Sequence, residues 1–233
     1  GQGLATIEEF LVEGLSKEYH VFSSKEVMSR VRGGNNTFEL RVSNQPIHGI
    51  SHGIDYLFLL NDHSLYRLVK RLKKNTVVFG EESFISEQEK ETHSLHVKTL
   101  DLTKLAKEAG SRLFANTILF GFISGMLALD KKIGHELIHD RFIEKSEKIV
   151  QDNQNAFDVG YQLGSDYDAP KRITKPASMP TLKTMDGNNA LGIGLLGGGV
   201  NYIASYPMSP GTTILSYLSA KGEEFGVLAE QAE

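Results

Sequence analysis

In the first hundred residues, hydrophobic side chains recur first at the spacing of a helix and then at the spacing of β-strands. The opening carries apolar side chains at the spacing of one helix face, namely Leu4, Ile7, Leu11 and Leu15. Short strands are predicted at residues 20–23 and at 37–43, where TFELRVS alternates with a period of two. The continuous apolar run at 55–60 is typical of a buried parallel strand, and another strand is predicted at 75–80. A helix with Asp62 as its N-cap is predicted between them, so the order favours an α/β fold, a mostly parallel sheet flanked by helices.

The pattern becomes helical after Asp101. A helix is predicted from an Asp101 cap to a Gly110 stop, and residues 116–130 are apolar nearly all round, which indicates a buried helix. Two amphipathic helices are predicted at 132–145 and 147–164. These helices form the helical C-terminal part of a first domain, residues 1–164.

The remaining residues predict a linker and part of a second domain. Residues 165–186 lose all periodicity and hold three of the six prolines, which is typical of a linker. Residues 187–233 are predicted as helix, strand, turn, helix and strand. This stretch is too short to bury a core alone, so we interpret it as the truncated start of an α/β domain.

Charge and composition narrow the possible functions. The net charge of −4 gives no long-range attraction to nucleic acid or to an anionic membrane, and the basic run RLVKRLKK is interpreted as the solvated face of a helix. No apolar run has the length of a membrane span and no signal peptide opens the chain, so we expect a cytoplasmic protein. The chain has no cysteine, which excludes disulfides, thiol catalysis and thiolate-bound iron–sulfur clusters within this polypeptide.

Two short motifs match known patterns but have a simpler explanation. HELIH at 135–139 has the spacing of a zinc site, but we expect His135 and His139 to face solvent, without a cleft or a third ligand, because other residues define the apolar side of that helix: Ile133, Leu137, Ile138 and Phe142. GIGLLG at 192–197 matches G-x-G-x-x-G, but a linker precedes it and a strand follows it, the reverse of the dinucleotide-binding order. We expect these glycines to lie in a closely packed helix, and we predict no metal site.

A third stretch is more informative about function than HELIH and GIGLLG. Residues 29–43, SRVRGGNNTFELRVS, place flexible backbone, two amides and a guanidinium at the edge of a predicted strand. Composition alone leaves an ordinary turn and a binding loop equally open.

The residues of this stretch, with others along the chain, resemble the 2-oxoacid:acceptor (ferredoxin) oxidoreductases. The gamma domain of that family has a G-G-Q-G turn, an S-x-x-R-G-G stretch and an acidic residue before an apolar strand. Residues 1 to about 164 are similar to it at Gly1, Gln2, Gly3, Ser29, Arg32, Gly33, Gly34, Asn35, Asp55 and Asn116. Residues 187–233 resemble the start of the alpha domain, with YPMSP as the sharper match, so the order is that of a fused gamma–alpha subunit.

The resemblance implies roles for residues near the end of the chain. In the family, the turn corresponding to YPMSP reaches thiamine diphosphate and the 2-oxoacid. The resemblance implies that Tyr206 and Ser209 bind substrate, that Pro207 contacts the cofactor, and that Ser209 is catalytic. In the family, threonine is usual at the position of Ser209, and serine is frequent at the position of Gly211. Glu233 would be the catalytic carboxylate that bonds the aminopyrimidine of thiamine diphosphate.

The same resemblance implies the reaction and the partners. It implies oxidative decarboxylation of a 2-oxoacid, with 2-oxoglutarate favoured over pyruvate, to an acyl-coenzyme A, and transfer of the electrons to ferredoxin. A beta subunit would hold the [4Fe-4S] cluster and Mg²⁺ and share the thiamine diphosphate, in a homo- or hetero-oligomeric complex, and residues 1–233 alone would be inactive. Two alternatives stay open. One is a non-catalytic scaffold of that complex, and the other is a nucleotide-binding α/β protein, for which GQG at residues 1–3 is the only phosphate loop.

Overall fold

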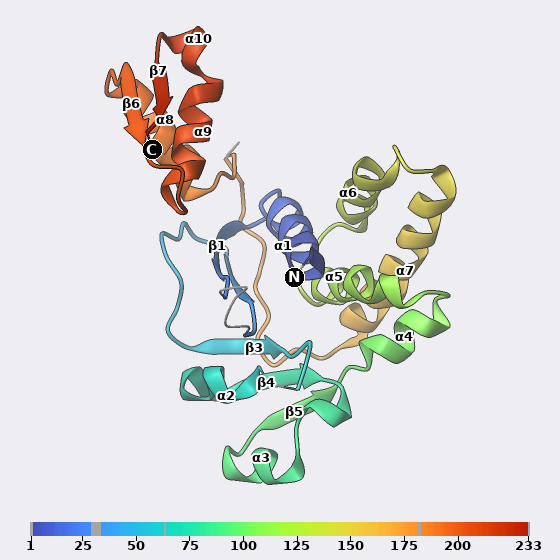
Figure 1. The fold of residues 1–233 in the computed structure, drawn as a ribbon. Coiled ribbons are helices and arrows are strands. Elements are labelled where there is room, and N and C mark those ends of the chain that lie inside the picture. Colours follow the sequence, from blue (N-terminus) through green and yellow to red (C-terminus); the bar gives the residue numbers. More distant parts are fainter. Residues whose placement is uncertain (1, 29–33, 63, 181–182, 233) are drawn as a thin grey trace. The chain divides into compact units, whose positions relative to one another are not determined.

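The computed structural model describes residues 2–28, 34–62, 64–180 and 183–232. The chain forms two compact units, Gly1–Pro180 and Thr181–Glu233. Figure 1 labels the helices and strands of both units.

The first unit begins with a helix and two small sheets. The helix α1 (Gln2–Leu15) precedes an antiparallel pair of strands, β1 (His20–Glu26) and β2 (Thr37–Ser43). The second sheet is parallel, in the order β3 (Ile54–Phe58), β4 (Leu72–Gly80) and β5 (His96–Thr99), with α3 (Glu87–Thr92) between β4 and β5 (Figure 1). The predicted α/β fold and the strands near 20–23, 37–43, 55–60 and 75–80 are confirmed.

The helix predicted to begin at Asp62 is wrong in its start and in its length. The helix α2 (Leu65–Leu68) is a single turn that begins after Ser64, whose hydroxyl donates to Asn61 Oδ1 at 2.8 Å. It continues as a 3-10 turn, Val69–Arg71, and the chain enters β4 at Leu72. The basic residues of this stretch therefore lie on a turn and a strand end, because there is no long helix whose solvent face they could form.

Four helices complete the first unit: α4 (Leu102–Glu108), α5 (Ala115–Met126), α6 (Lys131–Phe142) and α7 (Glu147–Asp166). The predicted cap is confirmed, because Asp101 Oδ1 accepts from the backbone N–H of Lys104 at 2.8 Å. Figure 1 shows α5 in the middle of this group, and it contacts α1, α4, α6 and α7. It is the buried helix that its all-round apolar sequence predicts, with Ile118 and Phe120 fully inaccessible.

Glycines allow α5 and α7 to cross with their backbones in contact. A Cβ placed on Gly160 of α7 would lie 2.0 Å from the carbonyl oxygen of Ile118 in α5. The same holds in the other direction, since a Cβ on Gly121 of α5 would lie 2.1 Å from the carbonyl oxygen of Phe157. Gly125 and Gly164 make equivalent approaches. Only glycine fits at these four positions, so the crossing is fixed by the sequence.

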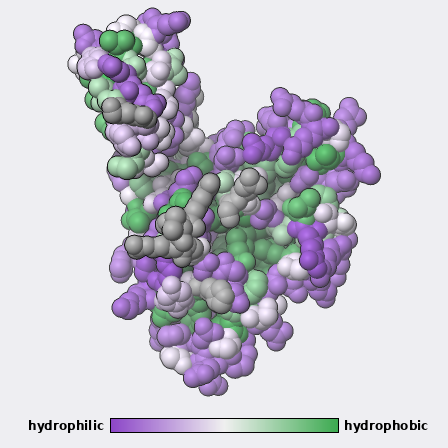
Figure 2. All heavy atoms as spheres, viewed as in Figure 1, coloured by the Kyte–Doolittle hydropathy of each residue, from purple (hydrophilic) through white to green (hydrophobic). Residues whose placement is uncertain are grey.

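Aromatic rings connect the helices with the parallel sheet. Phe79 of β4 stacks on Phe58 of β3, with 4.9 Å between ring centroids, and meets the ring of Phe122 in α5 edge-on at 5.2 Å. Tyr167, just beyond α7, also packs edge-on against Phe79 at 5.2 Å. The sheet and the helices therefore share one hydrophobic core. In Figure 2, hydrophilic residues cover most of the first unit, and hydrophobic residues show mainly where its surface is recessed.

The second unit follows the predicted order of elements. Its helices are α8 (Gly187–Gly197), α9 (Gly211–Ala220) and α10 (Gly222–Phe225), and its strands β6 (Tyr202–Ser205) and β7 (Leu228–Gln231) pair in parallel. GIGLLG lies in α8, as expected, but only Gly192 is closely packed: a Cβ there would lie 2.3 Å from the ring of Tyr217. Gly194 and Gly197 face open space. Within the described residues, no helix has the length and apolar character needed to cross a membrane.

Candidate functional site

The predicted substrate turn connects β6 to α9 in the second unit. Its backbone is held by two hydrogen bonds, from Met208 N to Tyr206 O at 2.8 Å and from Thr212 N to Met208 O at 3.3 Å. The peptide bond between Ser209 and Pro210 is cis. Tyr206 and Ser209 are exposed and Pro207 is half-buried. The two side chains predicted to bind substrate are therefore accessible on this turn.

The parallel pairing of β6 with β7 brings two distant segments to one sheet edge. Ser205, the last residue of β6, is paired with Gln231, the last residue of β7. The next residue, Ala232, donates its N–H to the carbonyl oxygen of Ser205 at 3.1 Å. Glu233 itself lies outside the described residues, but its chain neighbour Ala232 is hydrogen-bonded at the base of the 206–210 turn.

The start of α9 lies at the same edge and suits negative charge. The N-cap of α9 is Pro210, and no side chain caps the helix. The first N–H groups of a helix have no partner within the helix, and with the helix dipole they favour a carboxylate or an oxyanion nearby. This edge thus combines an exposed hydroxyl with backbone N–H donors, and donors of this kind favour an anionic group nearby.

In the first unit, the structure brings together two residues that the resemblance names. Gly3, in the first turn of α1, packs against the side chain of Asn116 in the first turn of α5, and a Cβ on Gly3 would lie 2.3 Å from Asn116 Nδ2. The amino ends of two helices therefore meet at one amide side chain. Gly1 lies outside the described residues.

The predicted binding loop is described only at its two ends, since Ser29, Arg32 and Gly33 lie outside the described residues. Met28 N donates to Asn36 Oδ1 at 2.9 Å and closes the base of the loop. Gly34 has φ +129°, a conformation that favours glycine. Arg67 donates to the carbonyl oxygen of Asn35 at 2.8 Å.

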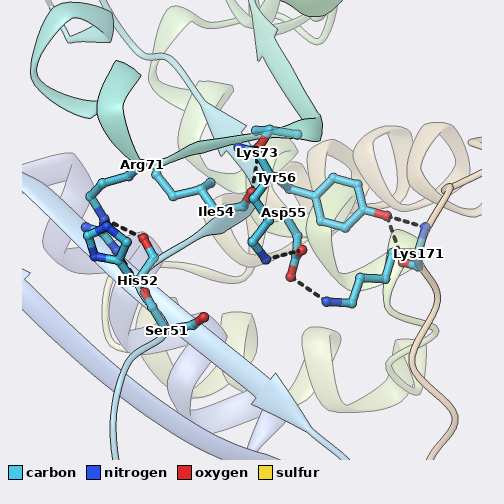
Figure 3. Close-up of polar contacts among 9 residues, drawn as sticks. Ser51, His52, Ile54, Asp55, Tyr56, Arg71, Lys73 and Lys171 are labelled. Atoms are coloured by element: carbon cyan, nitrogen blue, oxygen red, sulfur yellow. Dashed lines mark hydrogen bonds and ion pairs between the residues drawn. The ribbon is translucent and has the colours of Figure 1, made fainter.

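Asp55, the acidic residue of the resemblance, lies between two lysines (Figure 3). Its carboxylate accepts from Lys73 at 3.0 Å and from Lys171 at 2.7 Å. Partial burial acts to raise the pKa of this carboxyl, but the hydrogen bonds from Lys171 and Lys73 outweigh it and hold the pKa below its ordinary value. The two ion pairs therefore keep this aspartate charged. Asp55 and both lysines line an open pocket of about 400 Å³.

The basic run at 67–74 forms ion pairs, which corrects its interpretation as a solvated helix face. Arg71 binds Glu39 of β2 through both guanidinium Nη atoms, and it also donates to the carbonyl oxygens of Ser51 and His52, each at 3.0 Å (Figure 3). Arg67 pairs with Glu26 of β1 at 2.7 Å. The run therefore ties the antiparallel strands to the start of β4.

The histidines of HELIH do not both face solvent, so that prediction is wrong for one of them. His135 Nε2 lies 2.6 Å from Asp158 Oδ1 of α7, and its ring packs edge-on against Phe157 at 5.7 Å. The prediction considered α6 alone, whereas α7 covers this side of it. His139 is exposed, as expected. Among the residues that the structure describes, no group of three or more His, Asp or Glu side chains could hold a metal ion.

A comparison with protein families identifies the class of this protein. A profile described as pyruvate ferredoxin/flavodoxin oxidoreductase matches residues 1–163, well over half of the chain. The chain belongs to this family. The resemblance to 2-oxoacid:ferredoxin oxidoreductases is confirmed, and the protein is an oxidoreductase subunit of that kind.

Individual relatives agree with this class. A 2-oxoglutarate synthase subunit, KorC of Archaeoglobus fulgidus, is 27% identical over 177 residues, which are 75% of this chain and 82% of that protein. The fold is similar to 2-oxoglutarate:ferredoxin oxidoreductase from Magnetococcus marinus, solved with 2-oxoglutarate, coenzyme A and succinyl-CoA bound, with a TM-score of 0.86 and 22% identity. That match covers 99% of this chain and 41% of the other, so this chain spans less than half of its length.

A separate gamma subunit shows the same fold in part. The keto/oxoacid ferredoxin oxidoreductase gamma subunit from Geobacter sulfurreducens has a TM-score of 0.52 and 17% identity, over 71% of this chain and 94% of that subunit.

Proposed function

We propose that this chain is the gamma–alpha part of a thiamine-diphosphate-dependent oxidoreductase that decarboxylates 2-oxoglutarate to an acyl-coenzyme A and passes the electrons to ferredoxin. Residues 1–164 would be the gamma domain, 165–186 the linker, and 187–233 part of the domain that binds the pyrimidine of thiamine diphosphate. The name of the KorC relative and the ligands of the Magnetococcus enzyme favour 2-oxoglutarate over pyruvate.

The observation that carries the proposal is the shared edge of β6 and β7. This edge brings the turn with Ser209 to the segment that leads to Glu233, two sites far apart in the sequence. The exposed Ser209 hydroxyl and the amino end of α9, which no side chain caps, would suit the carboxylate end of a 2-oxoacid. Tyr206 and Pro207 would flank it.

We assign residues of the same edge to one side of the cofactor. Thiamine diphosphate, when bound, supplies the carbon nucleophile and the electron sink of the decarboxylation. In this chain Glu233 would hold the aminopyrimidine, Pro207 would pack beside it, and Ser209 would orient the substrate. A beta subunit would supply the [4Fe-4S] cluster and Mg²⁺, because the cysteine-free chain offers no thiolate for a cluster.

The experiment is an assay of the assembled complex. The protein is co-expressed with its partner subunits, and reduction of a viologen dye is measured with 2-oxoglutarate or pyruvate, with and without coenzyme A and thiamine diphosphate. We expect reduction that requires both additions and is faster with 2-oxoglutarate. Loss of one hydrogen bond to a charged substrate in Ser209→Ala should lower kcat/KM roughly 10- to 100-fold, and Ser209→Thr should retain activity.

A matched control separates catalysis from folding. Ser219 is an exposed serine near the end of α9, the helix that follows the turn, and Ser219→Ala should leave turnover unchanged. If Ser209→Ala also leaves turnover unchanged in a complex that is active with either 2-oxoacid, the turn has no catalytic role and the chain acts as a scaffold. An intact, cluster-loaded complex that reduces no dye with any 2-oxoacid would refute the reaction itself.

A further inference from the structure

Residues 167–175 lie in the predicted linker, yet they pack onto the first unit. Some side chains of this segment are covered and others are exposed: Tyr167, Ala169 and Ile173 are buried or half-buried, whereas Asp168, Pro170, Lys171 and Arg172 are exposed. Ala169 is only 7% exposed, and all three covered side chains join the hydrophobic core. The covered side chains on both sides of the exposed residues 170–172 show that the segment lies on the surface of the first unit.

A tyrosine of β3 clamps the backbone of this segment. The hydroxyl of Tyr56 donates to the carbonyl oxygen of Lys171 at 2.7 Å and accepts from its N–H at 3.0 Å, and Figure 3 shows both bonds on the same residue. The Lys171 side chain turns back to Asp55 at 2.7 Å. Two neighbours in β3 therefore hold one residue of the segment by three contacts.

Two polar contacts lie further along the segment. Thr174 Oγ1 accepts from Asn44 Nδ2 at 3.0 Å, and Lys175 pairs with Glu18 at 2.8 Å. After that the anchoring stops: within the described part of the chain, residues 176–180 and 183–185 form no hydrogen bond or ion pair with another described residue.

We propose that residues 167–175 are a fixed strap of the first unit, locked by Tyr56 and Asp55, and that the tether to the second unit comprises only residues 176–186. From the end of α7 to Asp186 the connection has 20 residues, 167–186. With the strap fixed to the first unit, 11 residues of this connection remain, 176–186. An extended chain spans at most about 3.6 Å per residue, so the reach between the units falls from roughly 70 Å to roughly 40 Å. The clamp residues thereby leave fewer residues for the connection between the two units.

Trypsin tests the strap in the full-length chain. The enzyme cleaves after Lys and Arg except before Pro, so the strap offers Lys171 and Arg172, the Lys175 bond is blocked by Pro176, and the tether offers Lys183. Under conditions where cleavage follows the population of open states, we expect the wild type to be cut at Lys183 at least about tenfold faster than in the strap.

Conservative variants assign the protection to the clamp. Tyr56→Phe removes both hydroxyl bonds and should speed cleavage in the strap about tenfold, with the Lys183 rate unchanged. Tyr66→Phe, which removes a hydroxyl from a tyrosine that is 75% exposed, is the matched control and should change neither rate.

A second pair of variants tests the ion pair between Asp55 and Lys171. Asp55→Asn should also speed cleavage in the strap, whereas Lys73→Met, which removes the other lysine bound to Asp55, should not. Equal wild-type rates in strap and tether, or equal behaviour of Tyr56→Phe and Tyr66→Phe, would overturn the proposal. Equal acceleration at Lys107 in α4 would show unfolding of the whole unit and would overturn it as well.

Discussion

Replacing Gly160 by alanine adds one methyl group at the point where α5 and α7 touch. The new Cβ would lie 2.0 Å from the carbonyl oxygen of Ile118, and real Cβ contacts are essentially never closer than 3.0 Å, so the helices must separate by about 1 Å. The obstacle is backbone inside a buried helix, which cannot rotate away as a side chain could. A gap of this size forfeits a quarter to a half of the dispersion energy of the contacts along the crossing.

The magnitude follows from two opposing effects. Alanine favours a helix over glycine by about 1 kcal/mol. Overpacking a core costs about 1–3 kcal/mol and occasionally more, and the upper end applies here because three further glycines share the same crossing. We therefore expect Gly160→Ala to lower the free energy of unfolding by about 2 kcal/mol net, and the melting temperature of a unit of this size by about 4–8 °C.

Thermal unfolding followed by circular dichroism measures this effect, with Gly194→Ala as the control. Gly194 lies inside α8 and a Cβ there meets no atom within 4 Å, so the propensity effect acts alone and stability should rise. A Gly160→Ala protein as stable as the wild type would refute the direct contact of the two helix backbones.

Three further predictions concern single groups. Thr117→Val leaves the buried Asn153 without the hydroxyl that donates to its Oδ1 at 2.9 Å, and urea unfolding should show a loss of about 1–3 kcal/mol. Burial raises the pKa of Tyr19, whose hydroxyl donates to the carbonyl oxygen of Leu127, to about 12, so this stabilisation is complete below pH 10, the ordinary value, and is lost as the pH rises to 12. Urea unfolding across this range should show the loss in the wild type and less of it in Tyr19→Phe, and a phenolate absorbance that reveals Tyr19 titrating at pH 10 would contradict the assignment. Gly211→Ala meets only an ordinary contact at 3.6 Å in the first turn of α9, so hydrogen exchange should report a slightly more stable helix, and a looser helix would argue against the described turn.

The strongest periodic patterns predicted the fold correctly. Apolar residues on every side of 116–130 could only mean a helix enclosed by others, and α5 is enclosed. The continuous apolar run at 55–60 predicted a parallel strand, because such a strand is covered on both faces, and β3 pairs in parallel with β4. Each of these patterns lies within one segment, so the element can be predicted from that segment alone.

The features that were missed depend on partners far away in the chain. Lys171 falls in the predicted linker because a proline and charged residues interrupt the apolar pattern there, and its clamp, Tyr56, lies 115 residues earlier. His135 was assigned to solvent because its partner, Asp158, belongs to the next helix. The basic run at 67–74 fits a helix by spacing alone, whereas the acidic residues that fix it lie on β1, β2 and β3.

The turn at 206–210 was found by its resemblance to a family, and no periodic pattern marks it. Its neighbourhood is not predictable in the same way, because the pairing of Ser205 with Gln231 joins two separate segments, and α9, which packs on both strands, supports that register.

The buried position of α5 has a consequence for synthesis of the chain. The stripe of α1 formed by Ile7, Leu11 and Leu15 is almost fully covered in the folded unit, in part by α5, which begins 100 residues after α1 ends. At translation rates of about 5–20 residues per second, α1 waits roughly 5–20 s for that partner. Among the described elements against which α1 packs most, β1 and β2 are already made during this interval and α5 and α6 are not, so the uncovered part of its stripe is open to chaperones on the ribosome. Polar substitutions on this stripe should therefore reduce the yield of nascent protein before any loss of stability in the finished fold is felt.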